Sequence, residues 1–386
     1  MKKFKFIDLF AGIGGFHQAM TELGGECVFA SEIDQHAIET YKENFGIDSD
    51  FNICDVNVED IPRHDVLCAG FPCQAFSIAG KCEGFNDETR GTLFFEIERI
   101  LKYHHPKYII LENVKNLTSH DQGRTWQIIE QHLHNCGYRL TLQPLIVSPH
   151  HFGIPQLRER VIILGVYDPS NTNKPIEIDL GIPKHKDDNS IYTILDQTVD
   201  NKYSISIEEE QLLTMWNEFY QGIDLNVIGF PIWYDWFKKE PPADASKWKK
   251  RIIERNNELY NNNKEFIDSW SAKYNNLEGY GVRDRKFEWQ AGDRIDSIWE
   301  GLIQFRQSGI RVKAPNCFQT LVAMVQTPII GKYKRRLTVR EAARLQSFPE
   351  TFILNNNDKQ AYKQLGNAVN VEVIKRCAKA LFTTYE

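Results

Sequence analysis

Short apolar runs alternate with longer helical patterns between Phe4 and Val166, and this alternation constrains the fold more than any other feature. Strands that alternate with helices in this way form a mainly parallel sheet covered by helices. The expected strands are Lys5 to Leu9, Glu26 to Ala30, Asp65 to Ala69, Tyr108 to Glu112, Arg139 to Val147 and Val161 to Val166. Helices are expected to begin at Gly15, Gln35, Thr92 and Arg124. The sequence therefore predicts an α/β domain over residues 1–180.

The second half of the chain has a different texture. Polar, turn-rich stretches at 168–173 and 185–190 are typical of linkers and place a domain boundary near 170 to 190. The part that follows lacks the alternation but holds seven of the eight tryptophans, from Trp216 to Trp299. That aromatic mass argues for a folded domain with its own core. Near the end, Val369 to Phe382 is expected to form one amphipathic helix.

Bulk properties exclude several classes of protein. The chain of 386 residues is long enough for two domains, and no stretch approaches the roughly 20 apolar residues needed to span a membrane. Met1-Lys2-Lys3 leads into a strand-like segment rather than a signal peptide, so we expect a cytoplasmic protein. The eight cysteines include no Cys-x-x-Cys pair, which argues against a disulfide framework and against a metal site.

Charge is distributed unevenly along the chain. The net charge of −6 argues against indiscriminate binding of polyanions. Between Gln304 and Leu345, however, nine basic residues are opposed by Glu341 alone. This stretch predicts a local footprint for phosphates, with a solvated basic face as the alternative.

Cys73 lies in a loop, Gly70-Phe71-Pro72-Cys73-Gln74-Ala75-Phe76-Ser77, that ends an apolar run. The run is expected to be a buried strand, and Pro72 stops its regular ladder. Cys73 would then follow the carboxyl end of a strand, where open α/β sheets bind ligands. A thiol in that place can act as a nucleophile, because cysteine is partly ionised near neutral pH. The alternative is a buried structural cysteine, which is the commoner kind.

The segment from Asp8 to Phe16 is a strand followed by a glycine-rich turn that opens a helix. Glycines let the backbone approach a ligand closely, as in dinucleotide sites. Glu32 lies 20 residues beyond Gly12, where an acid can accept hydrogen bonds from ribose hydroxyls. The turn departs from Gly-x-Gly-x-x-Gly, so the pattern predicts a nucleoside cofactor without specifically indicating a pyrophosphate.

Glu112 is placed at the end of another expected strand, on the same rim of the sheet as Cys73. A thiolate and a carboxyl group there can act together, one attacking a ring and the other protonating it. Taken alone, Glu112 is more often a helix cap or a surface residue. Arg158 and Arg160 enter a strand two residues apart, so they share a face suited to orient a carboxylate or phosphate, with an exposed strand face as the alternative.

Taken together, these residues resemble the DNA cytosine-5 methyltransferases of bacterial restriction-modification systems. The match covers 6–166 and 336–371, with the family's sequence blocks in order. The blocks are the Pro-Cys-Gln loop, Glu112-Asn113-Val114, Gln156-x-Arg158-x-Arg160, the Arg340 to Gln346 run and Gly366-Asn367-Ala368-Val369. The tryptophan-rich middle falls where the family has its variable target-recognition region.

The resemblance implies a fold and three parts of the chain. It implies a Rossmann-like, S-adenosylmethionine-dependent α/β domain at 1–180, an inserted smaller target-recognition domain at 185–350, and a segment at 357–386 that returns to the catalytic domain. Because Asn367 and Phe10 are assigned to one cofactor site, the final helix must pack on the first domain.

The resemblance also implies a chemical role for four side chains. Cys73 would add to carbon 6 of cytosine, and Glu112 would hold and protonate ring nitrogen 3, after which carbon 5 would take a methyl group from S-adenosylmethionine. Arg158 and Arg160 would support the flipped base and the catalytic carboxylate. A stacked base must be extruded to reach such a pocket, at a cost of a few kcal/mol.

Cofactor and DNA contacts are implied in the same way. Phe10, Gly12, Gly14 and Gly15 would shape the cofactor pocket, Glu32 would bind ribose, Ile33 would pack on adenine, Asp55 would receive the adenine amino group, and Pro72, Leu93 and Asn367 would complete the walls. Gln74, Ser77, Lys81 and Thr320 would contact DNA. Ala79 stands where many relatives have serine, which puts one phosphate contact in doubt.

These expectations describe a monomeric enzyme that methylates carbon 5 of cytosine in a specific double-stranded sequence and protects DNA from a cognate endonuclease. A related enzyme acting on transfer RNA is the nearest alternative, although the long inserted domain argues for groove reading. A catalytically silent DNA-binding protein is the third. The target sequence cannot be read from the residues.

Overall fold

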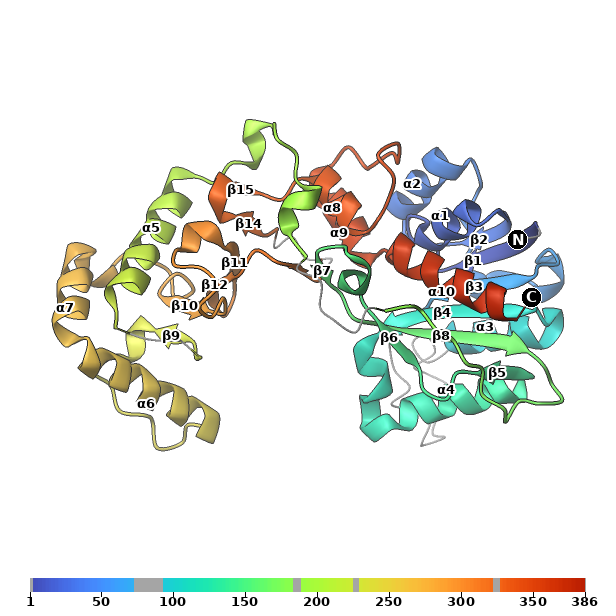
Figure 1. Cartoon of the computed structure of the whole chain (residues 1–386), viewed down its shortest axis with the longest axis horizontal. Helices are drawn as coiled ribbons and strands as arrows, with labels where there is room; N and C mark the ends of the chain where they lie inside the picture. The colour runs from blue at the N-terminus through green and yellow to red at the C-terminus, as the bar shows by residue number, and fades with distance from the viewer. Residues whose placement is uncertain (1–2, 73–92, 183–188, 225–228, 322–326, 386) are drawn as a thin grey trace. The chain divides into compact units, whose positions relative to one another are not determined.

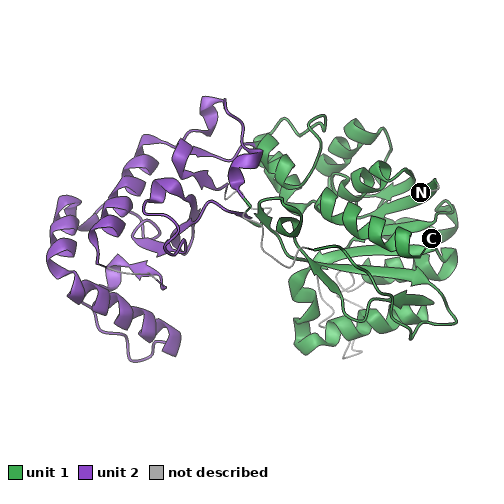
Figure 2. Ribbon diagram, in the orientation of Figure 1, with its two compact units in different colours: residues 1–189, 319–324, 339–386 green, residues 190–318, 325–338 purple. Residues whose placement is uncertain are grey.

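A computed structural model describes residues 3–72, 93–182, 189–224, 229–321 and 327–385 of the chain (Figure 1). The chain divides into two compact units (Figure 2). Unit 1 consists of 1–189, 319–324 and 339–386, and unit 2 of 190–318 and 325–338. The chain therefore leaves unit 1 and returns to it. The corresponding boundaries expected from the sequence were 185 and 350.

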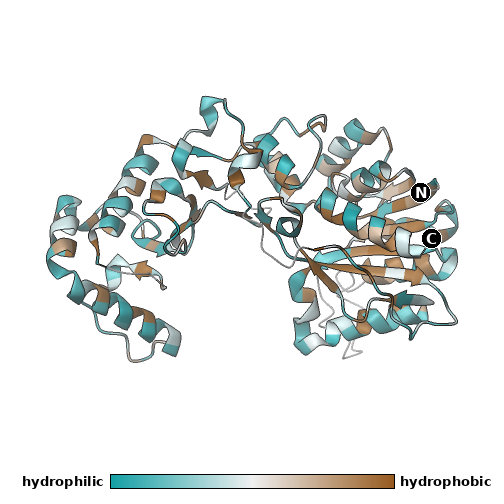
Figure 3. Ribbon diagram, in the orientation of Figure 1, coloured by the Kyte–Doolittle hydropathy of each residue, from teal (hydrophilic) through white to brown (hydrophobic). Residues whose placement is uncertain are grey.

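Unit 1 is built around a seven-stranded sheet with the order β2-β1-β3-β4-β8-β5, in which β6 also pairs with β8. The strands are β1 (Phe4–Leu9), β2 (Gly25–Ser31), β3 (Val66–Gly70), β4 (Tyr108–Val114), β5 (Tyr138–Leu140), β6 (Leu145–Val147) and β8 (Arg160–Tyr167). The first four are mutually parallel, and β8 runs antiparallel to its neighbours. The mainly parallel sheet predicted from the apolar runs is confirmed. In Figure 3 its central strands are strongly hydrophobic.

Helices cover both faces of this sheet (Figure 1). The helices of unit 1 are α1 (Gly15–Glu22), α2 (Gln35–Phe45), α3 (Leu93–His104), α4 (Arg124–Asn135), α8 (Val339–Leu345), α9 (Asp358–Asn367) and α10 (Val371–Thr384), of which α8 and α9 pack on each other rather than on the sheet. Alternate strand residues such as Ile7, Leu67 and Ile109 share a buried cluster with α3 and α4. The residues between them, which include Asp8, Cys68 and Glu112, point to the opposite face because side chains alternate along a strand.

The C-terminal helix packs on the beginning of the chain. α10 contacts α1, and its Phe382 ring lies 5.1 Å from the Phe4 ring and 4.9 Å from the Tyr108 ring. Tyr108 also donates its hydroxyl hydrogen to the backbone oxygen of Tyr385 over 2.6 Å. The last residues are therefore part of the same core as the first strand.

One predicted strand, Arg139 to Val147, is wrong as a single element. The chain forms β5 and β6 with a break between them, and both pair with β8. Leu140 pairs with Gly165 and Leu145 with Ile162, so the chain uses five steps where β8 uses three. The extra residues leave the ladder, and Pro144 among them has no N–H to contribute to it.

Unit 2 combines helices with a six-stranded sheet of order β15-β14-β11-β12-β10-β9. Its helices are α5 (Ile207–Gly222), α6 (Lys247–Asn262) and α7 (Lys264–Lys273). Its strands are β9 (Ile232–Trp233), β10 (Lys286–Trp289), β11 (Leu302–Arg306), β12 (Gly309–Lys313), β14 (Ile329–Ile330) and β15 (Arg335–Arg336). Two further short strands are β7 (Gln156–Leu157) and β13 (Phe318–Gln319).

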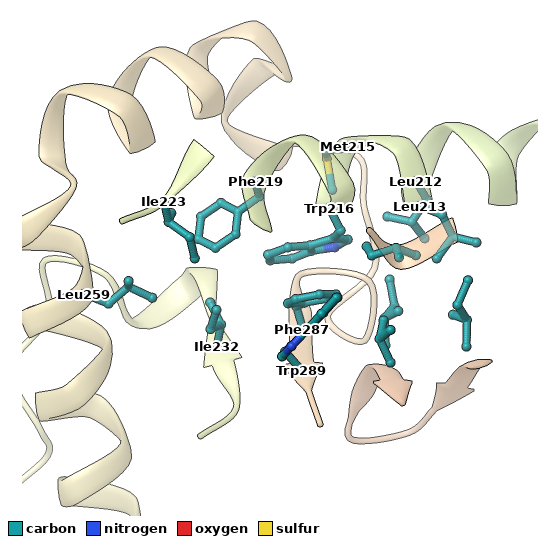
Figure 4. Packing of buried hydrophobic residues seen from close by; sticks show 14 of the residues in the cluster. Leu212, Leu213, Met215, Trp216, Phe219, Ile223, Ile232, Leu259, Phe287 and Trp289 are labelled. Carbon is teal, nitrogen blue, oxygen red and sulfur yellow. The ribbon is translucent and has the colours of Figure 1, made fainter. Parts of the chain in front are cut away.

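The core of unit 2 is aromatic, as the tryptophan content predicted. Trp216 of α5 stacks on Phe287 of β10, with ring centroids 5.1 Å apart and an interplanar angle of 7° (Figure 4). The indole N–H groups of Trp216, Trp270 and Trp289 donate to backbone oxygens at 2.8, 3.0 and 2.8 Å. These three indole rings are therefore buried with their polar atoms satisfied, which is the condition for tryptophan in a stable core.

Candidate active site

The expected site residues of unit 1 gather where the parallel strands end. Leu9 at the end of β1 pairs with Ser31 of β2 and with Ala69 of β3. The glycine turn after β1, Glu32 after β2 and Pro72 after β3 consequently leave the same edge of the sheet. Open α/β sheets bind ligands at this edge.

The glycine turn is held in left-handed backbone conformations. Phe10 has φ 55°, Gly12 φ 55° and Gly14 φ 87°. A non-glycine residue rarely adopts such an angle, so the turn stores strain at Phe10. This strain is typical of backbones shaped for a ligand.

The three glycines of the turn differ in what surrounds them. A Cβ atom on Gly14 would lie 2.2 Å from the Phe45 ring, and one on Gly15 would lie 2.7 Å from both Cγ2 and O of Val369. These two positions need glycine for packing against α2 and against the C-terminal segment. A Cβ atom on Gly12 would meet nothing within 4 Å, so Gly12 borders open space.

Glu32 fixes the turn to the end of the neighbouring strand. Its Oε2 accepts the N–H of Gly12 at 2.7 Å, and its Oε1 accepts the N–H groups of Ile33 at 2.7 Å and Asp34 at 2.9 Å. The Ile33 side chain is 76% exposed, which is unusual for isoleucine. An open glycine turn, a fixed carboxylate and an exposed apolar side chain therefore stand side by side.

The remaining expected cofactor residues lie in several elements. Asp55 is exposed in a short helical turn and accepts a hydrogen bond of 2.8 Å from the Asn52 amide. Pro72 is exposed after β3, and half-buried Leu93 begins α3. Asn367 ends α9 and is exposed, two residues before the Val369 that touches Gly15.

Glu112 is a buried carboxylate with one direct cationic partner. Its exposed fraction is 9%, and its Oε1 lies 3.0 Å from Nε of Arg160. Burial raises the pKa of Glu112, and the charges of Arg160 and Arg158 partly offset that rise. The helix-cap or surface alternative for Glu112 is wrong. The strand continues two residues beyond it, to Val114.

Glu112 also lies next to the strand that leads to Cys73. It pairs with Gly70 across β3 and β4, and a Cβ atom on Gly70 would lie 3.8 Å from its Oε2. The neighbouring Asn113 donates its amide to the backbone oxygen of Phe71 at 2.9 Å. This anchoring role of Asn113 was not inferred from the sequence, although its place beside Glu112 in the Glu-Asn-Val block was the available signal.

The two arginines have different partners. Arg158 is 3% exposed and donates Nη1 to the backbone oxygen of Leu321 at 3.1 Å and Nη2 to that of Ala368 at 2.9 Å. Arg160 bonds to Glu112. Burial, followed by the like charge of Arg160, lowers the pKa of Arg158. The two residues do not both lie in a strand, since Arg158 precedes β8, and the exposed-face alternative is wrong for the buried Arg158.

A small pocket, partly open to solvent, borders Glu112. Its walls come from β4, the two arginines, β8, the turn after β6 and the start of α10; the residues are Glu112, Val147, Pro149, Arg158, Arg160, Ile162, Val369, Asn370, Val373 and Ile374. A carboxyl group and two guanidinium groups thus face one apolar-walled space. Polar groups that converge in such a space are typical of ligand sites.

Several expected site residues fall outside the described residues: Cys73, Gln74, Ser77 and Lys81. Thr320 is described, and it donates its hydroxyl to the backbone oxygen of Leu157 at 2.8 Å. Among the described residues, no group of three or more His, Cys, Asp or Glu side chains is arranged to hold a metal ion. A helix long and apolar enough to cross a membrane is likewise absent from that part of the chain.

The fold and the site define a class. A largely parallel sheet with a strained glycine turn, a carboxylate after the second strand and a buried carboxylate on the fourth fits a Rossmann-like, S-adenosylmethionine-dependent methyltransferase. The family model of the C-5 cytosine-specific DNA methylases matches residues 4–383, and the chain belongs to that family. The resemblance drawn from the sequence blocks is confirmed, and the chain is an enzyme.

Relatives support the same assignment. The chain is 36% identical over 392 residues to the Type II methyltransferase M.DsaV of Dactylococcopsis salina, covering 99% of this chain and 87% of that protein. It is 36% identical over 390 residues to M.HpaII of Haemophilus parainfluenzae, covering 98% and 89%. Among solved structures, the Dnmt2 methyltransferase of S. pombe has a TM-score of 0.58 at 19% identity and covers 99% of each chain. That last likeness concerns the fold alone.

Proposed function

We propose that this enzyme methylates carbon 5 of one cytosine within a short double-stranded DNA sequence, with S-adenosylmethionine as methyl donor and Cys73 as covalent nucleophile. The observation that carries the proposal is the buried Glu112–Arg160 pair beside Gly70, three residues before Cys73. Family membership supports carbon 5 of cytosine as the target atom, and the burial of Glu112 beside Arg160 supports its role as the acid. Protection of host DNA from a cognate endonuclease is part of the proposal, since the relatives are named Type II methyltransferases.

The described residues around the glycine turn fit a nucleoside cofactor. Gly12 borders open space, Glu32 is fixed with carboxylate oxygens that retain acceptor capacity, and the exposed Ile33 side chain offers an apolar surface to a flat purine. When bound, S-adenosylmethionine supplies an electrophilic methyl group. In the proposal, Phe10, Gly12, Gly14, Gly15, Glu32, Ile33, Asp55, Pro72, Leu93 and Asn367 line its site.

Glu112 is proposed to act on ring nitrogen 3 of the extruded cytosine. Attack of the Cys73 thiolate on carbon 6 pushes an electron pair into the ring, and a proton delivered to nitrogen 3 neutralises it. A raised carboxyl pKa favours the protonated form that can make this delivery. Arg160 holds Oε1 of Glu112, so the carboxyl group cannot rotate freely. After carbon 5 is methylated, loss of its proton returns the electron pair and breaks the sulfur–carbon bond.

Unit 2 is proposed to recognise the DNA target. Along β10, β11 and β12, one set of alternating residues belongs to the aromatic core, including Phe287, Ile303 and Ile310. The other set forms the opposite face of the sheet and is mostly polar, apart from Leu302; its polar members, with Gln290 just after β10, are Lys286, Glu288, Gln290, Gln304, Arg306, Arg311 and Lys313. Side chains of these types bind phosphates and base edges.

The polar face carries a net positive charge, because its four basic side chains are opposed by Glu288 alone among the members named above. Glu288 pairs with Arg311 at 2.7 Å. Lys313 feels the charges of Arg311, Arg306 and Arg294, and burial together with this repulsion lowers the pKa of Lys313. A polyanion would relieve the repulsion. The same face continues to Trp233, whose ring lies under Nζ of Lys286 and against the 61% exposed Trp248.

Two experiments test the proposed function. Expression in a host that lacks DNA methylation, followed by bisulfite sequencing, should reveal one short motif with a protected cytosine. A genome without protected cytosines would refute the proposal. Cys73→Ala should abolish methyl transfer while DNA binding survives, whereas retained turnover would remove Cys73 from the mechanism. Cys54→Ala is the matched control, because Cys54 is an exposed free thiol on a different segment.

A further inference from the structure

Arg158 connects three segments of unit 1 that are distant in sequence. One Nη donor bonds to Leu321, 163 residues away, and the other to Ala368, 210 residues away. Leu321 belongs to the short segment on which the chain returns from unit 2 to unit 1. Ala368 precedes the Val369 that packs on Gly15. The buried side chain of Arg158 therefore connects the pocket beside Glu112 to Leu321 and, through Ala368, to the segment that packs on the glycine turn.

The main chain of Arg158 is held by two hydroxyl groups. Ser148, which is fully buried, accepts the N–H of Arg158 at 2.9 Å. On the other side, Thr320 donates to the backbone oxygen of Leu157 at 2.8 Å. Both the C=O and the N–H of the peptide group between Leu157 and Arg158 are thus hydrogen-bonded, which fixes the position of the Arg158 Cα atom.

The bond that Thr320 makes limits what else it can do. A threonine hydroxyl has one hydrogen to donate, and a DNA phosphate only accepts hydrogen bonds. Thr320 cannot donate to a phosphate while it donates to Leu157. This geometry argues against the DNA-contact role expected for Thr320 from the sequence.

We infer that Thr320 is a positioning residue for catalysis, which holds Arg158, and through it the charge facing Glu112, in the geometry that methyl transfer requires. The inference rests on the proposed function. Because Arg158 donates to the backbone oxygen of Leu321, a displacement of Leu321 would move Arg158, which lines the pocket beside Glu112.

The link has a consequence for the titration of Glu112. Arg158 lowers the pKa of Glu112 by its charge, together with Arg160. If Arg158 is less well held, its average charge lies farther from the carboxyl group, and the pKa of Glu112 rises further. The limb of the pH–rate profile that reports Glu112 should then move to higher pH.

The test compares three threonine variants. Thr320→Val removes the hydroxyl at nearly constant volume, Thr320→Ser retains it, and Thr384→Val is the matched control. Thr384 also donates to a backbone oxygen, at 2.9 Å, but lies 13 residues along α10 from Val371, about 20 Å from the site end of the helix. Single-turnover methyl transfer at saturating DNA and the dissociation constant for the target duplex are measured for each.

We expect Thr320→Val to lower the single-turnover rate by about two- to tenfold, the change that corresponds to loss of one ordinary hydrogen bond. Its DNA affinity should stay within twofold of the parent, and its pH–rate limb should shift upward. Thr320→Ser should restore most of the rate, and Thr384→Val should match the parent. Weakened DNA binding at an unchanged rate would overturn the inference, as would a serine variant no better than the valine variant.

Ser148→Ala provides a second measurement if Thr320→Val does not fold. Ser148 is fully buried, so its loss loosens Arg158 without removing a DNA contact. The alanine variant should show the same lowered rate and the same direction of pH shift at unchanged DNA affinity, and an unaltered rate and profile would refute the positioning mechanism. The parent enzyme reports on the proposed function separately, because its failure to methylate any duplex would remove that function before any variant is compared.

Discussion

Replacing Gly12 with alanine separates cofactor binding from backbone strain. Gly12 has φ 55° and borders open space, so the new methyl group meets no protein atom within 4 Å. Gly46, at the end of α2, has φ 68° and the same open surroundings. An alanine at either position lowers the free energy of unfolding by about 1 kcal/mol, because it must adopt a left-handed conformation. The two variants should therefore lose similar free energies of unfolding.

Only Gly12→Ala should weaken cofactor binding. If the open space beside Gly12 holds the nucleoside, the added methyl group must displace it or shift the turn. Overpacking of this kind costs about 1–3 kcal/mol, which corresponds to a five- to 150-fold rise in the dissociation constant. The hydrogen bond from the Gly12 N–H to Glu32 remains possible in the variant, because alanine keeps the N–H.

The assay is calorimetric titration with S-adenosylhomocysteine, which binds without turnover, beside thermal unfolding in the absence of ligand. Equal affinity in Gly12→Ala and Gly46→Ala would refute the assignment of the turn as the cofactor site. A third variant, Gly15→Ala, forces a contact of 2.7 Å with Val369. It should lose more stability than the other two, since its glycine serves packing.

Three further predictions concern buried charges. Glu112→Gln should lower kcat by about 10²–10⁴-fold. In the parent enzyme we expect kcat/KM to decline as pH rises through the raised pKa of Glu112; the variant should lack this decline, and an unchanged pH profile would count against Glu112 as the acid. Arg160→Met should lower the free energy of unfolding in urea at pH 7 by about 3–5 kcal/mol, because it leaves Glu112 buried without its partner at 3.0 Å. The double variant with Glu112→Gln should recover most of this loss. Losses of unfolding free energy that simply add in the double variant would contradict the pairing. Asp8 is fully buried, and burial raises its pKa in the folded protein. Its contribution to the free energy of unfolding is therefore fully present below the ordinary aspartate pKa and is lost as pH rises through the pKa of the folded state. Asp8→Asn should remove that decline, and an identical slope of unfolding free energy against pH would show that Asp8 does not cause it.

The strands and helix starts of unit 1 were predictable because their causes are local. Strands buried on both faces of a parallel sheet form nearly continuous apolar runs, which is what 66–69 and 108–111 show. The start of α2 at Gln35 is likewise local, since Asp34 accepts the N–H groups of His36 and Ala37. The break before β8 was missed because the apolar pattern continues through Pro144. That proline indicates a break, since it has no N–H to pair in a strand.

The partners of the site residues were not predictable in the same way. Nothing near Arg158 in the sequence indicates that its guanidinium bonds to Leu321 and Ala368. The same holds for Glu32, which the sequence offers as a ribose ligand and which also binds the N–H of Gly12. These contacts arise when the chain returns to unit 1 from a distant position. Residue types and order could be inferred for the site, whereas the hydrogen bonds that orient each group required coordinates.

The packing of α10 on α1 has a consequence for biosynthesis. The first strand and the glycine turn are made long before the helix that covers them, so Val369 fills the space beside Gly15 only later. At about 5–20 residues per second, tens of seconds separate the two events. Throughout that interval the nascent sheet lacks the cover of α10 on one face. We therefore expect this enzyme to gain activity only after α10 has left the ribosome and packed on α1, and the part of unit 1 made before α10 to depend on chaperones during synthesis.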